Sequence, residues 1–489
     1  MIKSNEKIAE LNQPIAVVGM ALRVPGAHTL EEFWDNLQRG EDCISRLSRL
    51  ELEQTALGPK DLSNPSIVHA KPMLDDLEYF DANFFGISDS MAKQTNPTHR
   101  LFLECCWEAM ESAGVKPGDK DQTTGVFVGG EFEDISYLAN HLDTNASNVS
   151  EGFAMQLGNF PDYLALRVSY ELDLKGPSMI SNATCATSLI AVQQAIQNLR
   201  SGACDAALAG GARIEFPPAP YYAAGIQGMR STSGRVRPFD AAADGTVFGN
   251  GLGVVLLKRL EDAIRDGNPI HAVIRGIGLS NDGRPEDKQS FTAPTVSGQK
   301  QAIRQAFENS GVSPETIGYV ECHGTATEIG DPVELRSLTE VYRESSNSIG
   351  HCKVGAVKGH IGHLGAAAGI AGLIKTCLVV SKGKFTALAN FEKPNPKIEL
   401  ADSPFVIEAE SHEWDRNGHP RRAGVSSFGF GGANAHLILE EYISPAKEST
   451  SDSTDQPRLL PLSAKSEAAL RRRIMDTASF CEDNPEVSV

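Results

Sequence analysis

The sequence is poor in positive charge and has no cysteine pairs of the kind that bind zinc. Its 489 residues include 45 Lys and Arg against 63 Asp and Glu, which gives a net charge of −18. Because phosphate binding needs a basic surface, this balance argues against nucleic acid as the main partner. The cysteines are odd in number and form no C-x-x-C pair. This pattern indicates reduced, intracellular thiols and neither a disulfide framework nor a zinc site.

Other signatures are also missing. The first twelve residues contain no apolar core of a signal peptide, and no uninterrupted apolar stretch is long enough to span a bilayer. Neither a phosphate loop nor a dinucleotide fingerprint occurs. His360 and His363 are three residues apart, but no carboxylate or cysteine at a suitable spacing joins them, so we expect no metal site. We expect a cytoplasmic protein that binds neither nucleic acid nor membrane.

What the sequence does contain is a regular alternation of strands and helices in both halves. This alternation predicts an α/β fold in which helices cover sheets. The predicted strands are 15–20, 125–130, 205–211, 253–258, 272–276, 317–321, 422–428, 434–440 and 458–465. The predicted helices are 30–37, 98–113, 188–200, 296–309, 331–342, 366–380 and 466–481.

Composition suggests where the domains begin and end. Residues 1–12 are polar and mixed in charge, typical of a tail or docking segment. Residues 443–457 are rich in Ser, Thr, Asp and Pro, typical of a linker. We therefore expect one main domain over 13–442. Residues 458–489 would begin a further unit that ends before it could form a core, so we expect the chain to be a piece of a longer protein.

One cysteine stands at the start of a predicted helix. Cys185 lies among small residues, between an apolar run and the helix 188–200, which Gly202 ends. The helix dipole and its free N–H groups favour a thiolate at this position and can hold an oxyanion. A lone cysteine is more often a buried structural residue.

Two histidines occupy similar junctions. His323 directly follows a predicted strand, and His363 precedes an Ala/Gly-rich helix, five residues after Lys358. Active sites of α/β proteins collect at such junctions. Each histidine alone is more often structural. Together with Cys185 they supply a nucleophile and two imidazoles, which suits covalent acyl transfer.

The motifs that contain these residues resemble those of the β-ketoacyl synthases, specifically the ketosynthase domains of modular polyketide synthases and of their hybrids with peptide synthetases. The resemblance covers roughly residues 13–442. It implies a thiolase-like fold, a layered α-β-α-β-α sandwich of two similar halves, usually as a homodimer. The segments that carry it are 15–26, 80–88, 182–191, 237–246, 321–334, 357–369 and 427–436.

The resemblance also implies an acyltransferase reaction that forms a C–C bond. Cys185 would take an acyl chain from an upstream carrier protein as a thioester. His323 and His363 would promote decarboxylation of a malonyl-type extender on a second carrier and would stabilise its enolate. The enolate would attack the thioester and lengthen the chain by two carbons. Lys358 would orient and polarise the His363 region.

Further roles follow from the same resemblance. The backbone N–H groups of Cys185 and Phe430 would form the oxyanion hole, and the Phe430 ring would gate the site. Thr325 and Thr327 would contact the phosphopantetheine arm. This arm belongs to the acyl or peptidyl carrier protein, so we expect no tightly bound cofactor. Neighbouring domains of a larger synthase are expected as partners.

Several positions depart from the usual family pattern, and they put substrate range and rate in question. The family commonly has an acidic residue at Asn182, small serines at Ala186 and Thr187, glycine at Ala326, asparagine at His360 and glutamate at Gly365. One alternative is therefore a non-extending ketosynthase that transfers or cyclises the bound chain, although such domains often lack the histidine present as His323. Another is a carrier-docking module that has lost catalysis.

Three other relatives of this family fit less well. A thiolase needs a second cysteine in the last glycine motif, 429–436, which contains none. The plant-type polyketide synthases pair cysteine with histidine and asparagine, whereas His363 keeps the second histidine. A decarboxylating loading domain typically replaces the cysteine, and Cys185 is present.

Overall fold

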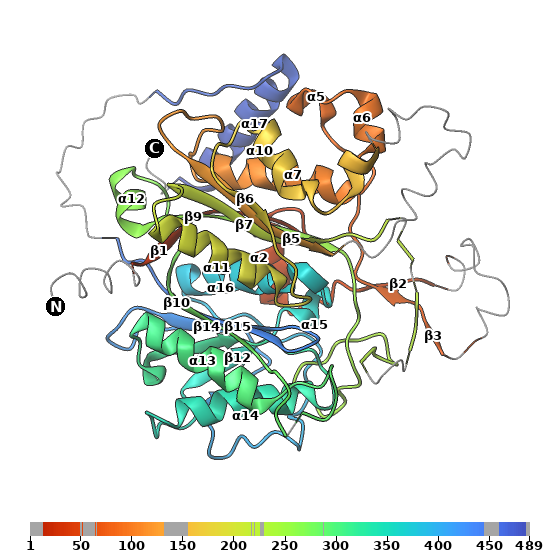
Figure 1. Ribbon diagram of the computed structural model, residues 1–489, viewed down its shortest axis with the longest axis vertical. Helices are drawn as coiled ribbons and strands as arrows, with labels where there is room; N and C mark the ends of the chain where they lie inside the picture. The colour runs from red at the N-terminus through yellow and green to blue at the C-terminus, as the bar shows by residue number, and fades with distance from the viewer. Residues whose placement is uncertain are drawn as a thin grey trace. The chain divides into compact units, whose positions relative to one another are not determined.

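The computed structural model comprises two compact units, residues 1–80 with 90–442 and residues 81–89 with 443–489. The predicted tail, 1–12, and nearly all of the predicted linker lie outside the residues that the structure describes. The described residues are 13–48, 51, 64, 66–131, 155–216, 218, 219, 221–224, 229–286, 288–444 and 459–485 (Figure 1).

The first half of the larger unit forms a mixed sheet in the order β1-β9-β7-β5-β6. Strand β9 is antiparallel to both β1 and β7, and β5 and β6 then continue parallel to β7. These strands are β1 (Ile15–Arg23), β5 (Thr124–Glu131), β6 (Ser178–Ile180), β7 (Ala206–Arg213) and β9 (Gly251–Arg259).

The second half repeats this topology. Its order is β10-β15-β14-β11-β12-β13, with β15 antiparallel to its two neighbours and the remaining strands parallel. The two halves meet where β1 pairs with β10. The same strand order and directions confirm the predicted pair of similar halves. These strands are β10 (Ala272–Asn281), β11 (Tyr319–Glu321), β12 (Cys352–Gly355), β13 (Phe405–Val406), β14 (Arg422–Phe428) and β15 (Ala433–Glu440).

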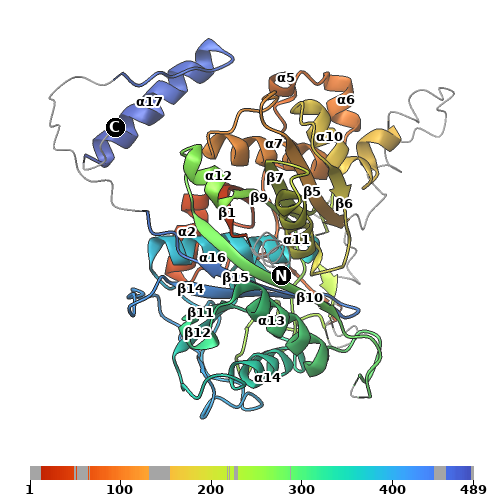
Figure 2. The same cartoon turned by 60° about the vertical axis from the view of Figure 1, so that its left-hand side comes forward.

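Helices form three layers around the two sheets (Figures 1 and 2). Helices α11 and α16 lie between the sheets, whereas α7 and α10 cover the outer face of the first half and α13 and α14 that of the second. This is the predicted α-β-α-β-α sandwich. The bounds are α7 (Pro97–Ser112), α10 (Tyr163–Glu171), α11 (Thr187–Arg200), α13 (Val296–Ser310), α14 (Gly330–Tyr342) and α16 (Ala368–Lys382).

The central helix α16 is mostly apolar because it is buried on all sides, and its one buried lysine, Lys375, pairs with Glu321 at 2.8 Å. The stretch Gly365–Lys382 is long and apolar enough to cross a membrane, but 89% of it is buried inside the protein. It is therefore the core helix of the sandwich. Gly369 allows the close approach to α11, since a Cβ there would lie 2.8 Å from Leu189 Cγ.

One predicted strand is absent. Residues 459–465 form no strand, because the apolar run contains Pro461, which cannot donate to a ladder, and no strand in the described part of the chain pairs with it. The helix after it forms as α17 (Glu467–Asp483), with Ser466 as its N-cap, and buries none of its side chains. The remaining elements are α2 (Leu30–Arg39), β2 (Ser45–Arg46), β3 (Ile67–Val68), β4 (Ala70–Lys71), α5 (Ala82–Phe85), α6 (Asp89–Gln94), β8 (Tyr222–Ala223), α12 (Leu260–Arg265), η2 (Pro314–Thr316), α15 (Lys358–Ile361) and η3 (Gly365–Ala367).

Candidate active site

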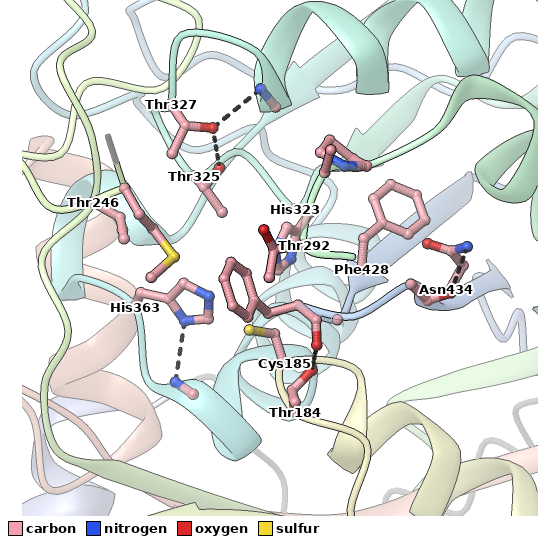
Figure 3. A pocket seen from close by; sticks show the side chains of 18 of the residues that line it. Thr184, Cys185, Thr246, Thr292, His323, Thr325, Thr327, His363, Phe428 and Asn434 are labelled. Carbon is pink, nitrogen blue, oxygen red and sulfur yellow. Dashed lines mark hydrogen bonds between the residues drawn. The ribbon is translucent and has the colours of Figure 1, made fainter. Parts of the chain in front are cut away.

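A cavity of about 770 Å³ brings together the three residues that the sequence singled out. Cys185 comes from the first half, and His323 and His363 come from the second (Figure 3). The Cys185 Sγ and one ring nitrogen of each histidine all lie within 4.8 Å of one another. The two rings meet edge to face, with centroids 5.5 Å apart.

Cys185 stands on a tight turn just before helix α11. Thr184 adopts a left-handed backbone, with φ of 50°, and the Ala186 N–H bonds the Ala183 carbonyl. Ser427 Oγ on β14 donates to the Cys185 carbonyl at 2.7 Å and so fastens the turn to the second half. The turn is therefore fixed from both halves of the fold, at the start of a helix as predicted.

The Cys185 side chain is buried in the structure, and this burial affects its pKa. Burial raises the pKa of Cys185 above its ordinary value of 9.0, while a hydrogen bond with the Phe430 backbone acts to lower that pKa. We expected the helix N-terminus to favour the thiolate. In the structure desolvation outweighs the favourable contacts, so the resting group is a thiol.

The glycine turn between β14 and β15 lies directly against the turn that carries Cys185. Thr184 Oγ1 donates to the Phe430 carbonyl at 3.1 Å, which holds the turn against the cysteine (Figure 3). A Cβ on Gly429 would lie 2.6 Å from the Ala183 carbonyl oxygen, so only glycine permits this approach. The Phe430 side chain lines the cavity and is 40% exposed.

His363 is held as one defined tautomer. The Gly365 N–H donates to His363 Nδ1 at 3.1 Å, so the ring proton must be on Nε2. The Nε2–H group is therefore available to donate a hydrogen bond to a molecule in the cavity. The ring stacks on Phe248 with centroids 4.8 Å apart. Burial, followed by the charges of Lys358 and Arg213, lowers the pKa of His363 well below its ordinary range, so the imidazole is neutral.

The tautomer of His323 is also set by a contact at Nδ1, but the contact comes from a side chain instead of a backbone N–H. Lys358 Nζ lies 3.5 Å from His323 Nδ1. Since a lysine ammonium group has donors and no acceptor, a protonated Lys358 places the proton of this ring on Nε2. We expected Lys358 to act on the His363 region; its hydrogen bond goes instead to His323, although its charge lowers the pKa of both histidines. Burial is the largest cause of the lowered pKa of His323.

Two buried carboxyls that we had not assigned a role support the His323 loop. Glu334 accepts from the backbone N–H groups of His323 and Gly324, at 2.6 and 2.8 Å. Asp331 accepts from Ala326 N–H at 3.0 Å, and burial raises the pKa of Asp331 to about 7. Both lie on α14, eleven and eight residues after His323. Both residues belong to the Asp-Pro-x-Glu stretch at the start of that helix. This stretch is the feature of the sequence from which their supporting role could have been predicted.

Thr325 and Thr327 line the cavity on the side of α14. Their hydroxyl oxygens are 3.1 Å apart, and Thr327 Oγ1 accepts from the Gly330 N–H at 3.1 Å (Figure 3). Both hydroxyls therefore stand on the cavity wall, where a polar chain could bond them.

The structure shows the local setting of three departures from the family pattern. Ala326 keeps a left-handed backbone, with φ of 59°, which glycine adopts without strain. His360 has its Nδ1 3.0 Å from the Glu41 carbonyl oxygen and its Nε2 3.1 Å from that of Ala387, and it does not line the cavity. Its contacts are those of a packing residue. Asn182 accepts from the Gly130 N–H at 3.2 Å.

Cysteine and histidine are also zinc ligands, and among the described residues Cys185, His323 and His363 are the group whose donor atoms lie close enough to consider a metal. The thiol is protonated in its resting state and each Nδ1 is already bonded to an N–H donor. The expectation of no metal stays a prediction.

A duplicated α/β sandwich that focuses a cysteine and two neutral histidines on one cavity defines a thiolase-like condensing enzyme. Comparison with known proteins gives the family. Residues 12–263 match the family model of the β-ketoacyl synthase N-terminal domain, residues 271–392 that of the C-terminal domain and residues 394–489 that of the ketoacyl-synthetase C-terminal extension. The chain belongs to the β-ketoacyl synthase family, as a polyketide-type ketosynthase domain of the acyltransferase class.

Individual relatives agree with this assignment. The chain is 43% identical to a phenolphthiocerol/phthiocerol polyketide synthase of Mycobacterium tuberculosis, over 97% of this chain and 32% of that protein. It is 38% identical to polyketide synthase PksM of Bacillus subtilis, over 97% of this chain and 11% of that protein. The chain thus spans a third or less of these two curated relatives.

A solved structure covers nearly the whole chain. Ketosynthase twelve from the bacillaene polyketide synthase of Bacillus amyloliquefaciens superposes with a TM-score of 0.89 at 34% identity, over 98% of this chain and 82% of that one. The ketosynthase from module 1 of the bacillaene synthase of the same species gives a TM-score of 0.85 at 35% identity, over 97% and 82%.

Proposed function

We propose that this domain extends an acyl chain by decarboxylative Claisen condensation with a malonyl-type extender. One observation carries the proposal: two histidines with strongly lowered pKa values each place a ring nitrogen within 4.8 Å of the Cys185 Sγ, while Nδ1 of His363 accepts from the Gly365 N–H and Nδ1 of His323 lies 3.5 Å from Lys358 Nζ. Two fixed donors converging there are suited to an oxygen that becomes negatively charged.

The first step would load the acyl chain. The Cys185 sulfur attacks the thioester carbonyl of the upstream carrier, and the carbonyl oxygen takes hydrogen bonds from the backbone N–H groups of Cys185 and Phe430. When the tetrahedral intermediate collapses, the carrier sulfur leaves and takes up the proton that the Cys185 thiol has lost. The acyl chain is then a thioester on Cys185.

The second step would form the new C–C bond. The malonyl carboxylate leaves as CO2, and its electron pair passes into an enolate whose oxygen is held by His323 and His363. The enolate carbon attacks the Cys185 thioester, and the Cys185 sulfur leaves and regains a proton from solvent. The product is a β-ketoacyl chain on the second carrier. The cavity favours CO2 loss because a carboxylate is poorly solvated among buried side chains.

The substrates would arrive on acyl or peptidyl carrier proteins, so no tightly bound cofactor is needed. Thr325 and Thr327 would hydrogen-bond the phosphopantetheine arm, and Phe430 would gate its entry. We place the domain, 13–442, in a larger cytoplasmic synthase, with 443–457 as the linker to the following unit, 458–489. The odd number of cysteines and the lack of a C-x-x-C pair support a reducing compartment.

A second copy of this chain is the proposed partner of the β6 edge. Strand β6 ends the strand order and has a neighbour on one side within the described sheet. Met179 on β6 is 42% exposed, and Leu166 and Tyr170 on the adjacent α10 are 50% and 82% exposed. An apolar edge of this kind is suited to an isologous contact that continues the sheet.

The alternative is a ketosynthase that accepts the chain and transfers or cyclises it without extension. The strained Ala326, three residues after His323, is the observation that favours it. The His323–Lys358 contact favours extension. It fixes the Nε2–H of His323 as a hydrogen-bond donor for the enolate, and transfer of the acyl chain without extension forms no enolate.

Intact-protein mass spectrometry of single variants separates these functions. Cys185→Ala should gain no acyl mass from a thioester donor. His323→Ala should be acylated like the wild type but should give no extended product with malonyl-loaded carrier. A wild type that is acylated and never extends the chain would support the non-extending alternative. A Cys185 thiol that reacts with neither thioester nor iodoacetamide would indicate a docking module without catalysis.

A further inference from the structure

The backbone and ring of His363 are held by two separate segments. On one side, the His363 N–H donates to Val247 O at 2.8 Å, the Gly249 N–H donates to His363 O at 3.1 Å, and the ring stacks on Phe248. On the other side, the Gly365 N–H fixes Nδ1. The position of the catalytic Nε2–H depends on the relative placement of these two segments.

Glu131, the last residue of β5, connects the two segments. Its Oε2 accepts from the Ala366 N–H at 3.2 Å and lies 3.4 Å from Arg213 Nε. Arg213 in turn donates to Gly249 O at 2.8 Å, and its guanidinium lies 5.6 Å from the centroid of the Phe248 ring. One carboxylate oxygen therefore contacts one segment directly and the other through Arg213.

The sequence makes room for this carboxylate at Gly365. A Cβ on Gly365 would lie 1.9 Å from Glu131 Oε2 and 2.5 Å from Arg213 Cδ, and the residue has a φ of 50°. Any side chain at this position would displace the carboxylate. Gly365 is also where the resemblance places a glutamate, and the Glu131 carboxylate occupies the space that such a side chain would enter.

We propose that Glu131 is a positioning residue for the condensation step, because it ties the Gly365–Ala366 segment to Arg213 and so keeps the Nε2–H of His363 directed at the enolate oxygen. The inference rests on the proposed function. Glu131 acts through His363 and forms no bond to the substrate in the reaction. The Arg213 side chain is 4% exposed, and a buried cation that loses its partner rearranges to find another.

The condensation step, in which Glu131 would act through His363, can be measured separately from the acylation step, in which Glu131 has no role. His363 is used for CO2 loss and enolate stabilisation, whereas acylation uses Cys185 and the oxyanion site. The charge of Glu131 raises the pKa of Cys185, so its removal does not slow acylation. A positioning role therefore predicts a selective loss in the second step.

The test compares Glu131→Ala, Glu131→Gln and the wild-type chain in two time courses, acyl mass gain on Cys185 and CO2 release from malonyl-loaded carrier. Glu340→Gln, which removes a carboxylate bonded to Lys300 and Arg336 outside the cavity, is the matched control. We expect Glu131→Ala to slow CO2 release by about 10- to 100-fold, as a misplaced catalytic group does, with acylation unchanged. Glu131→Gln retains an acceptor for Ala366 and should lose less.

Equal loss in both time courses, or wild-type CO2 release by Glu131→Ala, would overturn the proposal. If the wild type itself releases no CO2, the proposed function fails, and the crystal structure of the Glu131→Ala variant then decides the positioning role. We expect a displaced His363 ring in that structure, with a melting temperature close to that of Glu340→Gln. An unmoved ring would refute the positioning role.

Discussion

At the scale of single residues, the proposed condensation depends on which ring nitrogen of each histidine carries the proton. His323 and His363 receive N–H donors on Nδ1 from different sources, a lysine side chain and a backbone amide. Both therefore present Nε2–H as neutral donors. The backbone donor at His363 cannot be removed by substitution, whereas the donor at His323 can.

Replacing Lys358 by methionine removes that donor and leaves the tautomer of His323 unfixed. We expect Lys358→Met to lower the condensation rate by about 10- to 100-fold. The acylation rate should fall less, through the loss of a charge that lowers the pKa of Cys185. Single-turnover mass spectrometry of both steps measures this. Lys353→Met, which loses a buried lysine bonded to the Glu410 carbonyl outside the cavity, is the control. An equal loss in both steps would contradict the role given to Lys358.

The burial of Cys185 predicts a pH dependence. Because desolvation raises its pKa above 9.0, the thiolate fraction at lower pH rises about tenfold for each pH unit. We expect the rate of alkylation by iodoacetamide to increase by about 100-fold from pH 7 to pH 9 without levelling off. The adduct is followed by mass spectrometry with Cys185→Ala as the blank. A plateau reached below pH 8 would mean that the resting group is a thiolate.

The identities of these residues were predictable from sequence, but their mutual contacts were not. Cys185, His323 and His363 stand at strand-to-helix junctions, which hydrophobic periodicity locates. The partner of Lys358 depends on its rotamer and on the packing of α14, which a linear pattern does not contain. Glu131 lies 232 residues before His363, and nothing local in its strand marks it.

At the scale of elements, the site depends on how closely α16 approaches α11. These helices carry the segments of His363 and Cys185, and the Ile370 N–H donates to Ser188 Oγ at 2.9 Å across their contact. Periodicity predicted both helices within a few residues of their bounds. It also predicted a strand at 458–465 that does not form, since an apolar run alone cannot supply a pairing partner.

A side chain added at the contact between α16 and α11 should lower the stability of the protein. In Gly369→Ala the new Cβ would lie 2.8 Å from Leu189 Cγ, and overpacking of this kind lowers the free energy of unfolding by about 1–3 kcal/mol. Gly372→Ala, one turn later on α16, is the matched control, because its Cβ would lie 3.2 Å from Glu321 Cγ. Urea unfolding should show the larger loss for Gly369→Ala. A smaller loss than in the control would contradict the packing argument.

At the scale of the whole molecule, the two halves share the order and directions of five strands, and in the proposed reaction they divide the chemistry between them. The first half supplies the nucleophile and the second supplies both histidines. The glycine-rich strand ends in each half hinted at this duplication, and the resemblance to the β-ketoacyl synthases implied it. The sequence alone could not prove it, because equivalent strands share direction and position without sharing residues.

The β6 edge predicts a homodimer. Light scattering should give twice the chain mass of 52.5 kDa for the wild type. Met179→Asp places a charge on the proposed contact and should shift the population to monomer, whereas Ile264→Asp, an exposed position on α12 in the same half, should not. A wild-type monomer at micromolar concentration would contradict the proposed interface.

The most direct test of the central claim is the mass of the chain on the second carrier after reaction. Wild-type protein acylated on Cys185 is mixed with malonyl-loaded carrier, and the carrier is weighed intact. The proposed function predicts that the carrier bears the donor's acyl chain lengthened by two carbons as a β-ketone, with the acyl mass lost from Cys185. A carrier that keeps its malonyl group while Cys185 stays acylated would contradict condensation.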